Sequence, residues 1–178
     1  MRLFLAVQIP EEVKLYLSEI SKDLSGFKGI KRVHPENIHL TLFFIGGSQN
    51  PEDIAKKVSE IKFKKFSLKT SSFGYFPSHD KIKVIWQGFE DSMDLFNLQK
   101  EISSVLDSQE GYIPHITFAR VNRIFPFERK KIIEILESKV TKVFSFEVTN
   151  FQLYSSELTD VGPIYRVIQT FKASKHSQ

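Results

Sequence analysis

The chain has 178 residues, 41% of them hydrophobic, and a formal net charge of +4 at pH 7. This length supports one compact domain and excludes two domains of ordinary size. The sequence contains no cysteine, which excludes disulfides, zinc–thiolate sites and thiol nucleophiles and is more typical of the reducing cytoplasm than of a secreted protein.

Strand-like segments recur along the whole chain. The first, residues 2–9, is apolar but far too short to cross a bilayer, so we expect no membrane partner. Two others, 66–76 and 81–89, flank a turn-like Pro77-Ser78-His79-Asp80. The predicted strands cover residues 2–9, 38–45, 66–76, 81–89, 115–121, about 143–154 and about 163–172.

Amphipathic helices are predicted between these strands, because apolar residues recur at spacings of three and four. Pro51 opens the second helix, and the fourth covers residues 127–139. The apolar positions that define the first three are Val13, Leu17, Ile20 and Leu24; Ile54, Val58 and Ile61; and Leu95, Leu98, Ile102 and Val105.

Three pairs of segments repeat in the same order. His39 corresponds to His115 at an offset of 76 positions, FSLKTSSF (66–73) to FSFEVTNF (144–151) at an offset of 78, and VIWQGF (84–89) to RVIQTF (166–171) at an offset of 82. Duplication explains this order better than chance similarity of strands. We therefore predict an α+β fold with two lobes related by a pseudo-two-fold axis, each a small antiparallel sheet with helices on its outer face. We expect residues 1–178 to form one bilobal domain, with a frayed tail at about 173–178.

The tetrapeptides HLTL and HITF, which begin at His39 and His115, lie inside two of the predicted strands. Side chains alternate along a strand, so each motif buries its second and fourth residues and presents its histidine and threonine on the other face. If the two faces oppose each other, two imidazoles and the hydroxyls of Thr41 and Thr117 converge on one cleft.

This set of groups suits phosphate chemistry. The threonine hydroxyls can donate hydrogen bonds to phosphate oxygens, and one imidazole can accept a proton while the other donates one near neutral pH. Neither motif has an adjacent Asp or Glu that would bind a hard cation, so we expect no metal and no cofactor. A reaction without a metal needs an activated substrate, such as a strained 2',3'-cyclic phosphate on RNA.

The two motifs resemble the paired H-x-T-x motifs of the 2H phosphoesterase superfamily. Their surroundings are similar to its RNA 2',3'-cyclic phosphodiesterase branch, historically called 2'-5' RNA ligase. The segments that carry this resemblance are RLFLAVQIP, HLTLFFIG, FGYFPSHDKIKVIWQGF, PHITFAR and GPIYRVIQTF, which together span nearly the whole chain. The second motif ends in Phe118 where leucine is usual in the family.

The resemblance implies hydrolysis of RNA 2',3'-cyclic phosphate ends to 2'-phosphates without a metal, with one motif histidine as general base, the other as general acid, and the two motif threonines holding the phosphate. We assign the base to His115 and the acid to His39, an order that the sequence leaves open. It also implies action on RNA, with 2'-5' ligation as a secondary activity. Separately, we infer no obligate protein partner and expect a monomer. Phe44 and Arg120 stand where the family flanks the terminal nucleobase, although Arg120 suits a phosphate equally well. Both are five residues past a motif histidine, so only a bulge or a strand end would bring them to the histidine's face.

Two other functions remain open from the sequence. A non-catalytic RNA or nucleotide-binding module would use the same cleft without turnover, and a related phosphodiesterase would act on another cyclic or ADP-ribose-type substrate. The physiological RNA is also open, whether a tRNA-processing intermediate or a general cyclic end. Tyr165 is either a cleft residue or a packed strand tyrosine.

Overall fold

The computed structural model describes residues 2–47, 49–106, 111–160 and 162–174. The described strands are β1 (Arg2–Gln8), β2 (Ile30–Arg32), β3 (His39–Gly46), β4 (Phe66–Ser78), β5 (Lys81–Phe89), β6 (His115–Val121), β7 (Ser145–Val148), β8 (Asn150–Thr159) and β9 (Gly162–Lys172). The described helices are α1 (Glu11–Lys22), α2 (Pro51–Ser59), α3 (Met93–Leu106), α4 (Pro126–Glu137) and the short 3₁₀ helix η1 (Pro35–Asn37).

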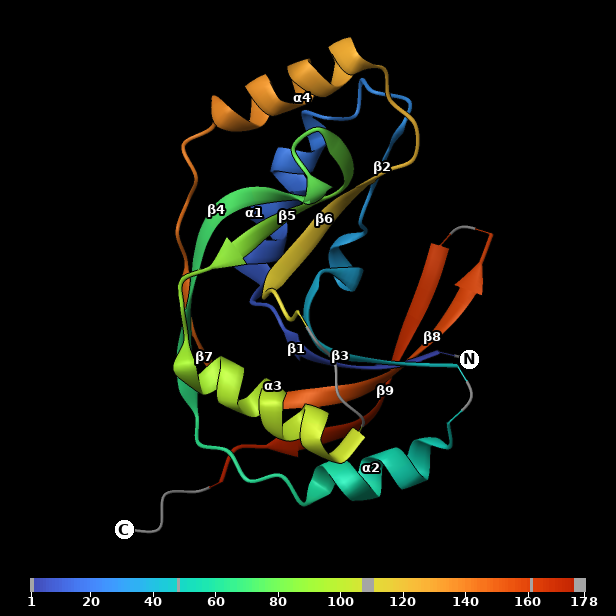
Figure 1. Cartoon of the computed structure of the whole chain (residues 1–178), viewed down its shortest axis with the longest axis vertical. Coiled ribbons are helices and arrows are strands. Elements are labelled where there is room, and N and C mark those ends of the chain that lie inside the picture. The colour runs from blue at the N-terminus through green and yellow to red at the C-terminus, as the bar shows by residue number, and fades with distance from the viewer. Residues whose placement is uncertain (1, 48, 107–110, 161, 175–178) are drawn as a thin grey trace.

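The strands pair throughout in antiparallel fashion, in the order β7-β4-β5-β6-β3-β1-β8-β9, with β2 added to β6. The predicted α+β fold with two lobes is confirmed (Figure 1). One lobe contains β2, β5 and β6 with α1 and α4; the other contains β1, β3, β8 and β9 with α2 and α3. The motif strands β3 and β6 meet at the centre, where the two lobes join.

The central contact reveals the symmetry of the repeat. Leu40 of β3 pairs with Ile116 of β6, and these positions are 76 apart, the same offset that relates the two histidines. Leu68 of β4 pairs with Phe146 of β7, and these are 78 apart, the offset of the second repeated pair. Two equivalent residues that face each other in an antiparallel ladder must straddle a local two-fold axis. The predicted pseudo-two-fold therefore passes through both contacts.

The third repeated pair, residues 84–89 in β5 and 166–171 in β9, occupies different positions in the sheet order of the two lobes. Strand β5 lies between β4 and β6, whereas β9 lies at the outer edge of the sheet, and β1 takes the place beside β3. The N-terminal strand thus breaks the symmetry. It is buried on both faces, as its continuous apolar sequence predicts: Leu3, Leu5 and Val7 join the main core, while Phe4 and Ala6 pack with Tyr154 on the other face.

Several boundaries differ from the predicted ones. The strand expected over 143–154 is two strands, β7 and β8, with a break at Thr149 and an extension of β8 to Thr159. Strand β2 and η1 were not predicted, because three residues are too few to show a period. Of the tail expected to fray, residues 175–178 lie outside the described residues. No helix within the described residues is both long and apolar enough to span a bilayer.

Gly74 provides a test of the packing of Trp86, which lies beside the second motif. Gly74 pairs with Trp86 across β4 and β5, and a Cβ at Gly74 would lie 2.3 Å from the Trp86 ring. We expect Gly74→Ala to lower the free energy of unfolding by about 1–3 kcal/mol through overpacking, measured by urea denaturation with the fluorescence of this single tryptophan.

Gly26→Ala is the matched control, because a Cβ at Gly26 would meet nothing within 4 Å. Its unfolding free energy should stay within about 0.5 kcal/mol of the parent. Equal stability of the two variants would contradict the described packing of Trp86 on β4.

Candidate active site

A β-bulge lies at the fourth residue of each motif. In β3, Leu42 has no partner on β1, and in β6, Phe118 has no partner on β5. An extra residue reverses the alternation of side chains beyond it. Of the two alternatives that the sequence left open, a bulge or a strand end, a bulge is present in both strands, and it returns Phe44 and Arg120 to the face that carries the motif histidines.

The two motif strands lie beside each other in one sheet, whereas the sequence suggested faces opposed across a gap. They share one registered pair, Leu40 with Ile116, which is fully buried. One position to either side, the same antiparallel register directs His39 toward Thr117 and His115 toward Thr41, on the face away from the core. Beyond this point the strands diverge into their lobes (Figure 1).

The motif side chains line one cavity of about 650 Å³. His39, Thr41, His115, Thr117 and Arg120 all contribute to its wall. Phe44 does not: its side chain is 54% exposed and lies outside the lining. The roles assigned to these six residues stay predictions. The cavity is also lined by Phe4, Gln8, Lys14, Lys31, Arg32, Val33, His34, Glu36, Asn37, Ile38, Tyr154, Gly162, Pro163, Ile164, Tyr165 and Val167.

Both motif imidazoles are oriented by the same local contact. The Nδ1 of His39 lies 2.7 Å from the carbonyl oxygen of Asn37, and the Nδ1 of His115 lies 2.7 Å from that of Ile113. A carbonyl can only accept, so Nδ1–H donates in each case and the neutral ring has its lone pair on Nε2. In His39 this Nε2 accepts from the Thr41 hydroxyl at 3.0 Å.

Aromatic rings enclose the two imidazoles. The His39 ring lies 4.9 Å from the Phe4 ring and 5.4 Å from the Tyr165 ring, and the His115 ring lies 4.9 Å from the Phe76 ring. Burial lowers the pKa of His39 to about 4, and the positive charge of Arg120 adds to the effect. Burial, followed by the same arginine, also lowers the pKa of His115. Both rings are therefore neutral at pH 7 in the free protein.

Sequence reasoning missed residues that the tertiary structure adds to the site. Asn37 holds His39 through its carbonyl and donates from its side chain to the carbonyl of Pro163 at 2.9 Å, which ties η1 to the β8–β9 hairpin. Phe4 and Lys14 come from β1 and α1, with no local motif to mark them. Tyr165, left open from the sequence, is a cleft residue, and burial raises its pKa.

A metal site is not visible in this region. Within residues 2–47, 49–106, 111–160 and 162–174, no three His, Cys, Asp or Glu side chains gather closely enough to hold an ion. The described residues of the cavity offer two Nε2 atoms for proton transfer and hydroxyls and basic side chains for anion binding.

The chain belongs to the LigT-like phosphoesterase family of the 2H superfamily, because the family model matches residues 7–86 and 90–165. It is 32% identical to an RNA 2',3'-cyclic phosphodiesterase of Archaeoglobus fulgidus, over 97% of this chain and 100% of that protein. It is 38% identical to an RNA 2',3'-cyclic phosphodiesterase of Thermotoga maritima, over 94% of this chain and 93% of that protein. The solved structure of TT0787 of Thermus thermophilus is similar, with a TM-score of 0.76, 28% identity and 97% of each chain covered.

The lowered pKa of His39 predicts a pH dependence of stability. Between about pH 6.5 and pH 4 the unfolded chain binds a proton at this residue that the folded chain does not, so the free energy of unfolding falls as the pH falls. The expected loss is about 1 kcal/mol per pH unit within this window, and His115 adds in the same direction. Urea denaturation at a series of pH values measures it.

His39→Gln is the matched control, because glutamine cannot be protonated in this range. Its stability should decline less steeply below pH 6.5 than that of the parent. Parallel curves for the two proteins from pH 7 to pH 4 would show that His39 keeps its ordinary pKa on folding.

Proposed function

We propose that this protein hydrolyses 2',3'-cyclic phosphate ends of RNA to 2'-phosphates, with His39 and His115 as its acid–base pair. The observation that carries the proposal is the matched pair of imidazoles on one cavity, each with Nδ1–H fixed by a carbonyl and Nε2 left for proton transfer. A binding module has no need of two such groups. The names of the relatives from Archaeoglobus and Thermotoga support the same activity.

In the proposed reaction, water attacks phosphorus while the general base takes its proton at Nε2. The P–O3' bond breaks, and the general acid gives a proton to the departing O3', which leaves a 2'-phosphate and a 3'-hydroxyl. The hydroxyls of Thr41 and Thr117 donate to the phosphate oxygens, where negative charge increases in the transition state. The same site would form a 2'-5' linkage if a 5'-hydroxyl replaced water, and we propose that as a secondary activity.

The Thr41–His39 hydrogen bond couples protonation to substrate binding. Neutral His39 accepts from the Thr41 hydroxyl through Nε2. A bound phosphate anion favours the protonated imidazole, which opposes the effect of burial on the pKa of His39. Once protonated, Nε2 can no longer accept, so the Thr41 hydroxyl is free to donate to the phosphate. His39 would then be ready to act as the acid and Thr41 as a phosphate ligand.

The first test removes each imidazole. We expect His39→Ala and His115→Ala each to lower the turnover of a cyclic-ended oligonucleotide by about 10²–10⁴-fold, the usual contribution of a general acid or base. The parent should remain active in EDTA, and its product should carry a 2'-phosphate. Phosphorus NMR identifies the product, and circular dichroism checks that the variants fold. Wild-type turnover in both variants would refute the assigned site.

A second test decides which histidine is the acid. A substrate with sulfur in place of the bridging O3' expels a thiolate, which needs no proton because a thiol is far more acidic than an alcohol. If His39 is the acid, His39→Ala should regain most of the parent activity on this substrate. His115→Ala should remain about 10²-fold slower or worse, because its missing base still has to activate water. The opposite pattern would reverse the two roles.

A further inference from the structure

The cavity has more positive charge than its proton chemistry requires. Four basic side chains line it, Lys14, Lys31, Arg32 and Arg120, and Glu36 is the one carboxylate on its wall. Within the part of the chain that the structure describes, none of the four forms an ion pair, and Glu36 lies 3.8 Å from His34 instead. A single cyclic phosphate carries one negative charge. The surplus of cations indicates a site for a second anion.

The surplus is concentrated beside the β2–β6 contact. Lys31 of β2 stands directly opposite Arg120 of β6, and both side chains are exposed. Like charges directly opposite in an antiparallel pair destabilise it. An anion that lies between them replaces this repulsion with two charge-assisted hydrogen bonds. Arg32 is next along β2 and also lines the cavity, so it adds a third positive charge to this wall.

This position adjoins the reaction site, because the charge of Arg120 acts on both motif histidines and Lys31 lies on the neighbouring strand β2. The bulge at Phe118 puts Arg120 on the same face as His115 and Thr117, farther along β6. A chain that enters the cavity with its cyclic phosphate at the two histidines would pass Arg120 and then Lys31 on its way out. Lys14 of α1 lines the same wall, and its charge is felt at His39.

We propose that Lys31, Arg32 and Arg120 bind the 5'-phosphate of the terminal nucleotide, so that the enzyme selects RNA strand ends over free nucleoside 2',3'-cyclic phosphates. The inference rests on the proposed function and specifies its substrate. An RNA end always carries this second phosphate, one nucleoside away from the cyclic one, whereas a cyclic nucleoside monophosphate lacks it. The three cations would therefore favour a cyclic phosphate at the end of a strand over one on a free nucleoside.

The test compares two small substrates that differ in this one group. Cytidine 2',3'-cyclic phosphate and its 5'-phosphorylated form have the same base, sugar and reacting phosphate. We expect the parent to show roughly a ten-fold higher kcat/KM for the 5'-phosphorylated substrate, the effect of about one charge-assisted contact. Raising the salt concentration should reduce this ratio, because screening weakens exposed charges.

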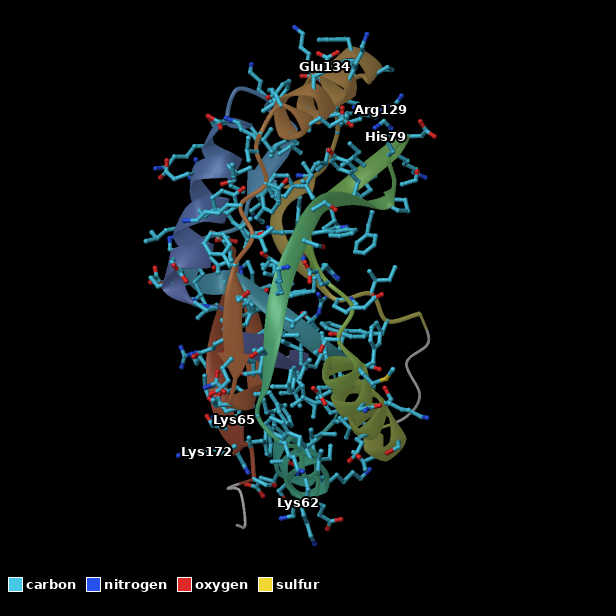
Figure 2. The ribbon with its side chains drawn as sticks, turned by 90° about the vertical axis from the view of Figure 1, so that its left-hand side faces the viewer. Lys62, Lys65, His79, Arg129, Glu134 and Lys172 are labelled. Carbon is cyan, nitrogen blue, oxygen red and sulfur yellow. The ribbon has the colours of Figure 1, made fainter. Side chains whose placement is uncertain are left out.

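The double variant Lys31→Gln/Arg32→Gln should bring the ratio close to one. Because the ratio compares two substrates in the same protein, a general loss of activity or of folded material affects both kcat/KM values equally and leaves the ratio unchanged. Lys62→Gln/Lys65→Gln is the matched control, because these lysines lie at the far end of the molecule from the lobe that carries β2 (Figures 1 and 2). The control should keep the ratio of the parent.

Two results would overturn the proposal: a ratio near one in the parent, or a ratio that survives in the Lys31/Arg32 double variant. Failure of the proposed function is a different result, in which neither substrate is turned over. In that case, calorimetry with cytidine 2'-phosphate and cytidine 2',5'-bisphosphate still tests the second anion site. Roughly ten-fold tighter binding of the bisphosphate, lost in the double variant, supports it, and equal affinities refute it.

Discussion

The pairing of Leu40 with Ile116 is the contact on which the rest of the site depends. It joins β3 to β6, is fully buried, and lies on the pseudo-two-fold axis of the repeat. Because the residues on either side of the pair face away from the core, the two motifs meet as neighbours on one surface. The two lobes then diverge from this contact. The cavity is the space that they leave over it.

Two backbone features turn this contact into the candidate active site. The bulges at Leu42 and Phe118 reverse the alternation just past each motif, which brings Arg120 into the cavity and leaves Phe44 exposed outside its lining. The carbonyls two residues before each histidine fix which ring nitrogen carries the proton. Both features come from the backbone, so neither depends on a particular side chain being present. The two halves of the proposed site differ mainly through what β1 and β2 add.

Those additions make the site asymmetric. Strand β1 places Phe4 against His39, and burial there lowers the pKa of that histidine to about 4. Strand β2 extends β6 and brings Lys31 opposite Arg120. Aromatic rings thus lie against both histidines, whereas the paired basic residues Lys31 and Arg120 belong to β2 and β6 alone. An asymmetric ligand such as a nucleotide, with a base at one end and phosphates at the other, matches such a surface better than a symmetric one does.

The sequence by itself determined the longer helices and strands and the faces on which His39 and His115 lie, because hydrophobic periodicity and strand alternation are local properties. It determined the two-lobe fold through the repeat of three segments in the same order. Only the tertiary structure decided what surrounds those histidines. The contributions of Asn37, Lys14 and Lys31 arise from strand order and from contacts between segments far apart in the chain, which no local pattern encodes. The split of the 143–154 strand was missed for the same reason: β7 and β8 pair with different partners, β4 and β1, and the break at Thr149 allows both.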